Sequence, residues 1–165
     1  MPILIDGYNV LNVVGILGHG RGPGSLQRAR LALLNFLAES LDPAEVPHTT
    51  VVFDARDPPP GLPRQQVHRG LTVRFAPPDQ EADAVIEDLI RADSAPRRLT
   101  VVSSDHAIQR AARRRRAKAV KSEEWYADVV RARRDRLPSP EAPERPSVPL
   151  LQEDVEYWLR EFGFY

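Results

Sequence analysis

The sequence predicts an α/β protein with a mainly parallel sheet of about five strands flanked by helices. Apolar runs rich in β-branched residues recur at 3–5, 49–53, 71–75 and 99–102, and a weaker run lies at 117–121. Helical patterns separate most of these runs, and strands that alternate with helices form parallel sheets through right-handed crossovers. Because the runs are almost continuously apolar, both faces of the sheet are expected to be covered.

The first helix is predicted over residues 25–41. Apolar residues recur there at spacings of three and four, which is the repeat of a helix with one apolar face. Ser25 suits the N-cap position, because its hydroxyl can accept a hydrogen bond from the first turn. The glycine-rich segment 18–24 matches no phosphate-binding loop, so we expect a mobile loop that joins the first strand to this helix.

Three further helices are predicted downstream. Residues 79–93 place apolar side chains at i, i+3, i+4, i+7 and i+8, which is the spacing of one helical face. Residues 105–116 and 123–134 can both be helical. Ser122 suits the N-cap of the latter, and two glutamates stand in its first turn, where the helix dipole favours negative charge.

The chain is predicted to have three parts. Residues 1–135 carry all the strands and the helices described so far and form the folded domain. Residues 136–149 are rich in proline and predict a linker or an extended arm. Residues 150–165 have an apolar stripe at helical spacing. This helix docks on the domain or meets a partner; docking is favoured, since exposed aromatic patches are uncommon on monomers.

The composition excludes several classes of protein. The 165 residues are 42% hydrophobic and 28% charged, as in soluble globular proteins. Because there is no cysteine, disulfides and thiolate metal sites are excluded. No apolar run approaches the roughly 18 residues of a membrane span, and a strand begins at Ile3 without a preceding signal peptide. We therefore expect a cytoplasmic protein without a membrane partner.

Charge is unevenly distributed along the chain, although the formal net charge is zero. Residues 97–136 carry 13 basic and 5 acidic side chains, a local +8, whereas 79–93 and 141–165 have local charges of −5 and −4. Of the 23 basic residues 21 are arginine, which suits bidentate contacts to phosphate. A GC-rich or thermophilic coding bias would explain the excess of arginine equally well, but not its clustering.

Aspartates follow three of the predicted strands. Asp6 and Asp54 come directly after apolar runs, and Asp105 follows a third run within three residues. If the strands are parallel, these side chains share the carboxyl edge of the sheet, where α/β proteins bind ligands. Asp83 lies in the first turns of helix 79–93 and borders its apolar stripe, so it is expected to reach the same edge.

Clustered carboxylates need either shared protons or a cation. Mg²⁺ and Mn²⁺ prefer oxygen ligands, and at a phosphodiester such ions activate a water and stabilise the leaving oxygen. The alternative for a single aspartate is a helix N-cap, which Asp79 and Asp105 would suit. Asn9 can hydrogen-bond Asp6 or a phosphate, or it can form a turn with Gly7; the residues leave both alternatives open.

Four segments together resemble the NYN branch of the PIN-like nucleases, in particular its bacterial YacP-like group. They are ILIDGYNVLN at 3–12, VVFDAR at 51–56, EADAVIEDLI at 81–90 and VVSSDHAIQ at 101–109. The resemblance covers about residues 1–135 and implies a PIN-like, Rossmann-like parallel sheet. It also implies a Mg²⁺- or Mn²⁺-dependent ribonuclease.

The resemblance assigns roles to individual residues. The family's acidic metal ligands match Asp6, Asp83 and Asp105, its asparagine matches Asn9, and Asp54 matches the aspartate after the second strand. These five residues are the predicted catalytic set. The predicted RNA contacts come instead from the basic block after Asp105: Arg110, Arg113, Arg114 and Arg116. The alternative for this block is a solvated helix face paired with the acidic C-terminal segment.

The sequence therefore predicts a metal-dependent endoribonuclease whose partner is RNA, alone or presented by the ribosome or another complex. The oligomeric state stays open. One alternative is an RNA-binding module that does not cleave. Another is an α/β phosphatase or nucleotide-binding protein, which the absence of a DxDx[TV] motif and of a phosphate loop disfavours.

Overall fold

The structure is a computed structural model that describes residues 1–14, 24–54 and 64–137. The predicted proline-rich arm and terminal helix, and the predicted loop at 18–24 except Gly24, lie outside the described residues. Residues Met1–Arg133 form one compact unit. The strands are β1 (Ile3–Asp6), β2 (Thr49–Phe53), β3 (Gln65–His68), β4 (Leu71–Phe75), β5 (Thr100–Val102) and β6 (Lys118–Val120). The helices are α1 (Gly7–Val14), α2 (Ser25–Ser40), α3 (Ala82–Ala92), α4 (His106–Arg114) and α5 (Ser122–Arg136).

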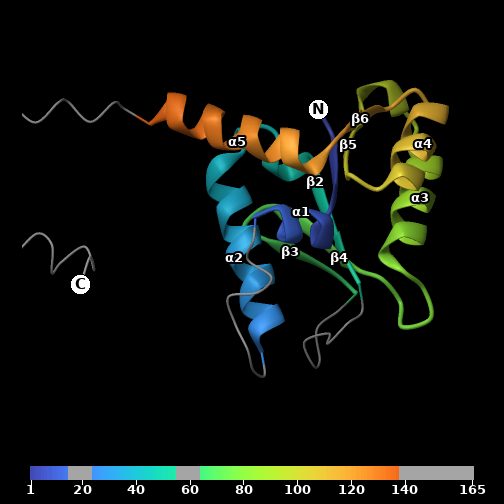
Figure 1. The fold of residues 1–165 in the computed structure, drawn as a ribbon, viewed down its shortest axis with the longest axis horizontal. Coiled ribbons are helices and arrows are strands. Elements are labelled where there is room, and N and C mark those ends of the chain that lie inside the picture. The colour runs from blue at the N-terminus through green and yellow to red at the C-terminus, as the bar shows by residue number, and fades with distance from the viewer. Residues whose placement is uncertain (15–23, 55–63, 138–165) are drawn as a thin grey trace, which may run out of the picture. The chain divides into compact units, whose positions relative to one another are not determined.

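The strands form one six-stranded sheet in the order β3-β4-β2-β1-β5-β6. Every neighbouring pair is parallel except β3 and β4, so the predicted mainly parallel α/β fold is confirmed. Helices cover both faces of the sheet: α1, α2 and α5 lie on one side, and α3 and α4 lie on the other (Figure 1). Each layer buries its own apolar cluster against the strands.

Strand β3 was not predicted. Its sequence, QQVH, holds a single apolar residue, and its side chains alternate between exposed and half-buried, as expected of an edge strand with little core to face. It pairs with β4 through a turn at Arg69 and Gly70, whose φ angles are 49° and 92°. Two-residue hairpin turns of type I′ require positive φ at both positions, so the HRGL stretch was the signal for this hairpin.

Helix α1 was also not predicted, because it follows β1 without a linker and has only eight residues. Gly7 makes this possible. A Cβ at Gly7 would lie 2.4 Å from the Phe53 ring and 2.9 Å from the Val52 carbonyl oxygen. Only glycine permits such a close approach of backbone to a neighbouring strand, so the glycine of the DGYN stretch serves packing at this point.

The helix starts differ in detail from the predictions. Gly24, with φ of 79°, is the N-cap of α2, so the prediction of Ser25 as N-cap was wrong. Helix α3 begins at Ala82, three residues after Asp79, so Asp79 is not its cap. Ser122, which was predicted as the N-cap of α5, is the first residue of that helix, and its hydroxyl donates to Asn9 Oδ1. The prediction of Asp105 as the N-cap of α4 is confirmed.

One arginine lies inside the first layer. Arg30 of α2 is 1% exposed and lies 5.4–5.8 Å from the ring centroids of Tyr8, Phe53 and Phe75. It also donates to the Tyr8 hydroxyl at 2.5 Å. A desolvated guanidinium against aromatic rings gains cation–π attraction, so these contacts join α2 to α1 and to the ends of β2 and β4.

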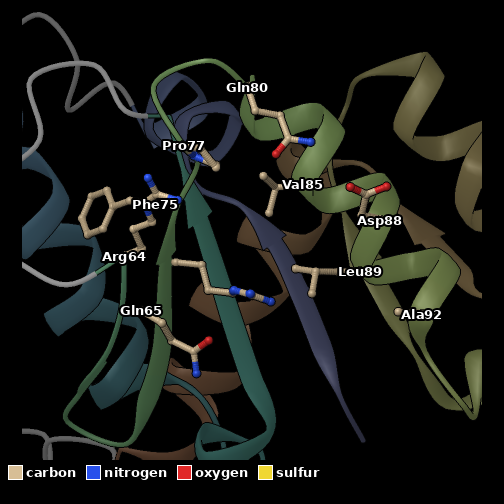
Figure 2. Close-up of a pocket in the computed structure, with 10 residues that line it drawn as sticks. Arg64, Gln65, Phe75, Pro77, Gln80, Val85, Asp88, Leu89 and Ala92 are labelled. Atoms are coloured by element: carbon tan, nitrogen blue, oxygen red, sulfur yellow. The ribbon is translucent and has the colours of Figure 1, made fainter.

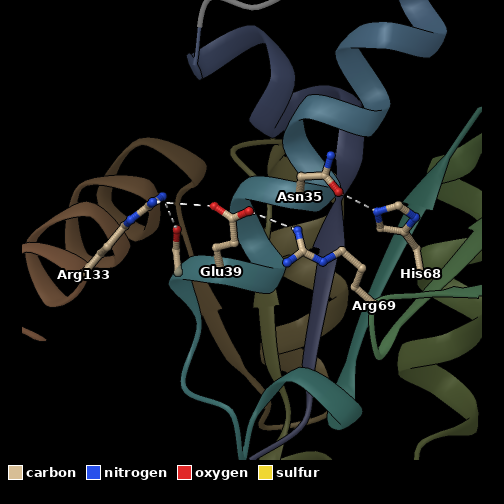
Figure 3. Close-up of polar contacts among 6 residues, drawn as sticks. Asn35, Glu39, His68, Arg69 and Arg133 are labelled. Atoms are coloured by element: carbon tan, nitrogen blue, oxygen red, sulfur yellow. Dashed lines mark hydrogen bonds and ion pairs between the residues drawn. The ribbon is translucent and has the colours of Figure 1, made fainter. Parts of the chain in front are cut away.

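A polar network joins the other end of α2 to its neighbours (Figure 3). Glu39 forms ion pairs with Arg69 of the β3–β4 turn at 3.0 Å and with Arg133 of α5 at 3.6 Å. Asn35 and His68 are joined by a hydrogen bond of 2.8 Å. Exposed pairs of this kind contribute little stability each, so the network mainly fixes the positions of the hairpin and α5.

None of the described helices is long and apolar enough to cross a membrane.

We expect Gly7→Ala to lower the free energy of unfolding by about 1–3 kcal/mol, because the added methyl group overpacks the contact between α1 and β2. Urea denaturation measures the loss. In a Phe53→Leu background the penalty should shrink, since the ring edge that the methyl group meets is gone. Equal penalties in the two backgrounds would contradict the close approach as its cause.

Candidate active site

The carboxyl ends of β1 and β5 lie at the point where the strand order reverses. From β1 the chain runs to β2 on one side, and from β4 it crosses through α3 to β5 on the other. Crevices at such switch points are the usual ligand sites of open α/β sheets. Asp6 ends β1 and Asp105 follows β5 by three residues, so two of the predicted carboxylates flank the switch point.

Asp6 is the most buried of these carboxylates, with an exposed fraction of 6%. The Ser103 hydroxyl donates to its Oδ2 at 2.9 Å. Burial raises the pKa of Asp6 to about 6. The negative charges of Asp83 and Asp105 also raise this pKa, whereas the hydrogen bonds from Ser103 and the Asn9 backbone lower it. The strand therefore ends on a carboxylate whose ionised form is poorly compensated by the protein.

Asp83 belongs to the first turn of α3. Its pKa is raised, first by partial burial and then by the charges of Asp105 and Asp54. Asp54 positions this helix, because its Oδ1 accepts a 2.7 Å hydrogen bond from the backbone N–H of Ala82. The helix has no cap from its own N-cap side chain, so a strand-end aspartate far away in sequence supplies the capping oxygen.

Asp105 caps α4. Its Oδ1 accepts from the backbone N–H groups of Ala107 and Ile108 at 2.8 and 3.1 Å. Its own N–H donates to the Ser103 hydroxyl oxygen at 3.1 Å, and the Ser103 carbonyl accepts from the buried Gln109 side chain at 2.9 Å. Ser103 thus connects the carboxylate of Asp6 to the backbone of Asp105.

Asn9 lies in the first turn of α1 and fastens three elements together. Its Oδ1 accepts from the Ser104 backbone N–H at 2.9 Å and from the Ser122 hydroxyl at 2.6 Å. Ser104 in turn donates from its hydroxyl to Glu123 at 2.5 Å, which lowers the Glu123 pKa. Of the alternatives considered for Asn9, the structure shows its backbone N–H on Asp6 and its side chain on the loop after β5 and the start of α5.

The structure thus brings Asp6, Asn9, Asp54, Asp83 and Asp105 to one edge of the sheet. Sequence reasoning named Ser122 only as a helix cap and missed the hydrogen bonds by which three serines organise this edge: Ser103, Ser104 and Ser122. The only signal was the pair of serines directly before Asp105. A hydroxyl there can turn toward strand β1 only because β5 lies beside β1, and that adjacency is set by the sheet order.

The side chains at this edge can be compared with the ligands that a metal ion prefers. The carboxylates offer oxygen ligands, and no ion pair among the described residues involves Asp6, Asp83 or Asp105. This donor set fits Mg²⁺ or Mn²⁺ in kind. Within residues 1–14, 24–54 and 64–137, however, no group of three or more acidic or histidine side chains is already arranged to hold a metal ion. A cation would therefore have to draw the carboxylates closer together.

The predicted RNA-binding arginines are all exposed and lie on or just after α4. A helix rises 1.5 Å per residue, so Arg110 lies about 7 Å and Arg113 about 12 Å along the axis from Asp105. Arg116 follows the helix with φ of 61°. The N–H groups of Arg116 and Ala117 close the helix on the carbonyls of Arg113 and Ala112 at 2.9 Å each. Glycine normally occupies this left-handed position.

Residues 3–154 match the family model described as YacP-like NYN domain. Two solved structures of Rae1 (YacP) from Bacillus subtilis are similar to the chain. One of them, a structure of a mutant, has a TM-score of 0.65 at 22% identity, with 99% of this chain and 85% of that chain covered. The other has a TM-score of 0.63 at 23% identity, with 99% and 84% covered. At these identities the structures show a shared fold. No curated protein matches the chain.

The Asp6 pKa predicts how stability varies with pH. In the folded protein the pKa is about 6, against 3.8 for an ordinary aspartate. Between these pH values the folded state binds more protons than the unfolded state, so stability contributed by Asp6 is present below about pH 4 and is lost as the pH rises through 6. A carboxylate buried without a counter-ion therefore destabilises the metal-free protein at neutral pH.

We expect Asp6→Asn to be more stable than wild type in EDTA at pH 7.5, by about 1–3 kcal/mol, because a tenfold change in an ionisation constant corresponds to about 1.4 kcal/mol. The gap should close near pH 4. Urea denaturation across pH 4–8 measures it, with Asp128→Asn on the surface of α5 as the control. A wild type that is more stable at pH 7.5 than at pH 5, with no advantage for Asp6→Asn, would contradict the raised pKa.

Proposed function

Because the chain belongs to the YacP-like NYN domain family, we propose that it is a Mg²⁺- or Mn²⁺-dependent endoribonuclease. The observation that supports the proposal is the repulsion between the aspartate carboxylates at the switch point. The charges of Asp83 and Asp105 raise the pKa of Asp6, and the charge of Asp105 raises the pKa of Asp83. No described basic side chain forms an ion pair with these three carboxylates. A hard divalent cation bound by these carboxylates would offset their repulsion.

In this proposal each residue has a distinct task. Asp6, Asp83 and Asp105 would hold the cation, which when bound supplies an activated water and stabilises the leaving oxygen. Ser103 fixes the Asp6 carboxylate relative to the backbone of Asp105. Asp54 fixes α3, and with it Asp83, by capping the helix. The latter two are positioning roles, since they act through the predicted ligands.

Asn9 joins α1 to the loop after β5 and to the start of α5. Its amide oxygen is occupied by Ser104 and Ser122, so the orientation of the amide is set by two donors. The Asn9 backbone N–H lowers the pKa of Asp6 and favours its ionised form. Asn9 would therefore keep Asp6 ready for a cation and hold the loop that carries Asp105.

The arginines of α4 would bind the RNA backbone beyond the cleaved bond. Arg110 is nearest to Asp105, and Arg113, Arg114 and Arg116 continue the basic surface toward the far end of the helix. A non-glycine residue with positive φ is uncommon and suggests a function for its side chain. Arg116 occupies such a position, which supports a requirement for its guanidinium.

We expect Asp83→Asn to abolish cleavage of single-stranded RNA in Mn²⁺, by more than the 10–100-fold that loss of an outer-shell partner typically causes. RNA affinity in EDTA should stay equal or rise, because one repulsive charge is gone, and the melting temperature should not fall. Cleavage assays, fluorescence anisotropy and thermal melts measure the three properties. Asp128→Asn, an exposed aspartate on α5 paired with Arg131, is the control and should cleave like wild type.

The outcomes separate the alternatives. Retained cleavage in Asp83→Asn would remove this residue from the site. RNA binding by wild type without metal-dependent cleavage would favour the RNA-binding module. Hydrolysis of small phosphate monoesters with RNA left intact would favour the phosphatase.

We expect Arg116→Gly to affect stability and RNA binding in opposite directions. Glycine relieves the left-handed backbone, which costs other residues about 1–2 kcal/mol, so the variant should melt at the same or a higher temperature. Loss of one phosphate contact should reduce the slope of log K against log salt by about 1. Arg97→Gln removes an exposed arginine at the opposite edge of the sheet and should leave that slope unchanged. An unchanged slope in Arg116→Gly would mean that Arg116 does not contact RNA.

A further inference from the structure

A groove of about 360 Å³ lies beside α3, on the flank of the helix away from Asp105. Figure 2 shows it with Val85 and Leu89 projecting from α3 on one side and Gln65 of β3 on the other. Its volume falls in the range of about 300–1,000 Å³ typical of small-molecule sites. Six of its lining residues decide what it can bind: Arg64, Gln65, Arg74, Val85, Asp88 and Leu89.

The groove and the aspartates lie on opposite flanks of the same helix. Ile86 is fully buried and marks the core-facing stripe of α3. At 100° per residue, Asp83 lies about 60° to one side of Ile86, and Leu89 lies about 60° to the other. The upper end of the groove is at Pro77 and Gln80, between the end of β4 and the start of α3. A single strand of RNA that crosses the carboxyl edge near Asp83 can therefore enter the groove by passing over the first turn of α3.

The floor of the groove is polar. Arg74 is the register partner of Val52 in the parallel pair with β2, and Val52 packs in the apolar cluster of α3 and α4. Residues in register share a face, so Arg74 lies on the α3 side of the sheet. Gln65 lies directly opposite Arg74 in the antiparallel pair and shares this face. The exposed Arg64, directly before β3, adds a second guanidinium to the lining of the groove.

The charge of the groove favours an anion. None of the ion pairs among the described residues involves Arg64 or Arg74. The acidic lining residue, Asp88, is paired with Arg91 at 2.8 Å. The groove therefore offers two guanidinium groups for a phosphate, two side-chain amides for hydrogen bonds, and an apolar wall formed by Val85 and Leu89 for a planar ring.

We propose that this groove binds one unpaired nucleotide of the RNA, with its base against Val85 and Leu89 and its phosphate near Arg64 and Arg74. Unpaired bases of single-stranded RNA are splayed out and stacked on aromatic side chains or on guanidinium planes. The groove has two guanidinium groups, the aromatic Phe75 in its lining, and the apolar wall of Val85 and Leu89. A base-paired nucleotide cannot enter, so the site selects RNA that is single-stranded beside the cleaved bond. The inference rests on the proposed function, since it assigns a substrate class to that nuclease.

The test measures binding in EDTA, which separates the groove from the chemistry. Labelled single-stranded RNA of about ten nucleotides is titrated with wild type, Arg74→Gln, Arg64→Gln and Arg97→Gln. The first two variants should bind several-fold more weakly, and Arg97→Gln, a matched change at the opposite edge, should bind like wild type. The same sequence held in a duplex should bind weakly to all four proteins. Far-ultraviolet circular dichroism and thermal melts confirm that each variant is folded.

A scan of abasic sites locates the bound nucleotide. Each position of the RNA is replaced in turn by a ribose without a base. One position should weaken binding to wild type several-fold and have little further effect on Leu89→Ser, because the base and the apolar wall are then lost together. Independent, additive losses at every position would overturn the proposal.

The possible results distinguish the groove from the nuclease. Equal RNA affinities of wild type, Arg74→Gln and Arg64→Gln would overturn the groove proposal, even if the protein cleaves RNA. Equal binding of duplex and single strand would overturn it as well, and would leave the groove for a protein partner. Loss of affinity in Arg74→Gln together with an abasic-sensitive position would support the groove, even if wild type proved unable to cleave and the proposed function failed.

Discussion

Asp6 places an ionisable group at the end of the central strand, where 94% of its surface is withdrawn from water. Burial of a carboxylate without a counter-charge is unfavourable, and the raised pKa of Asp6 expresses that cost. The surroundings reduce the cost only in part, through the Ser103 hydroxyl and the Asn9 backbone. The two residues that hydrogen-bond Asp6 also bond the backbone of the loop after β5: Ser103 accepts from Asp105, and Asn9 accepts from Ser104. The position of Asp6 is therefore tied to that of the loop that carries Asp105.

Backbone contacts and helix starts hold the carboxylates of this edge in place, although their negative charges repel one another. Gly7 lets α1 begin directly after Asp6 by allowing its backbone to contact Phe53. Asp54 caps α3 from the neighbouring strand, and Asp105 caps α4. Each acidic side chain at the edge is thus attached to a helix start, where the unpaired N–H groups stabilise negative charge. The cap of α4 uses one carboxylate oxygen of Asp105, Oδ1, so the other oxygen stays available for the proposed metal ion.

Helix α3 has different functions on its different flanks. Its core stripe packs on β1 and β2 through residues such as Ile86, and one flank carries Asp83 toward Asp6 and Asp105. The other flank forms the wall of the groove above β3 and β4. In the proposed nuclease, this geometry would let catalysis and substrate selection depend on separate side chains of one rigid element. Sites on regular elements are positioned more accurately than sites on loops.

The sequence by itself determined the class of fold and the acidic edge. Continuous apolar runs can be satisfied only by a sheet covered on both faces, and parallel strands bring their carboxyl ends together whatever their order. The approximate meeting of Asp6, Asp54, Asp83 and Asp105 followed from those facts and from the resemblance to a nuclease family. Helix α1 and strand β3 did not follow. A helix of eight residues without a linker is too short to show a clear periodic pattern, and an edge strand with one apolar residue shows none.

Only the tertiary structure decided how the edge is organised. The order of the sheet places β5 beside β1, and this adjacency turns Ser103 into the donor to Asp6. It also brings Ser104 and Ser122 to Asn9 from segments 95 and 113 residues away. The groove depends on the antiparallel register that sets Gln65 opposite Arg74. Hydrogen bonds and grooves of this kind depend on distances between segments far apart in the chain, and local spacing of residue types carries no information about those distances.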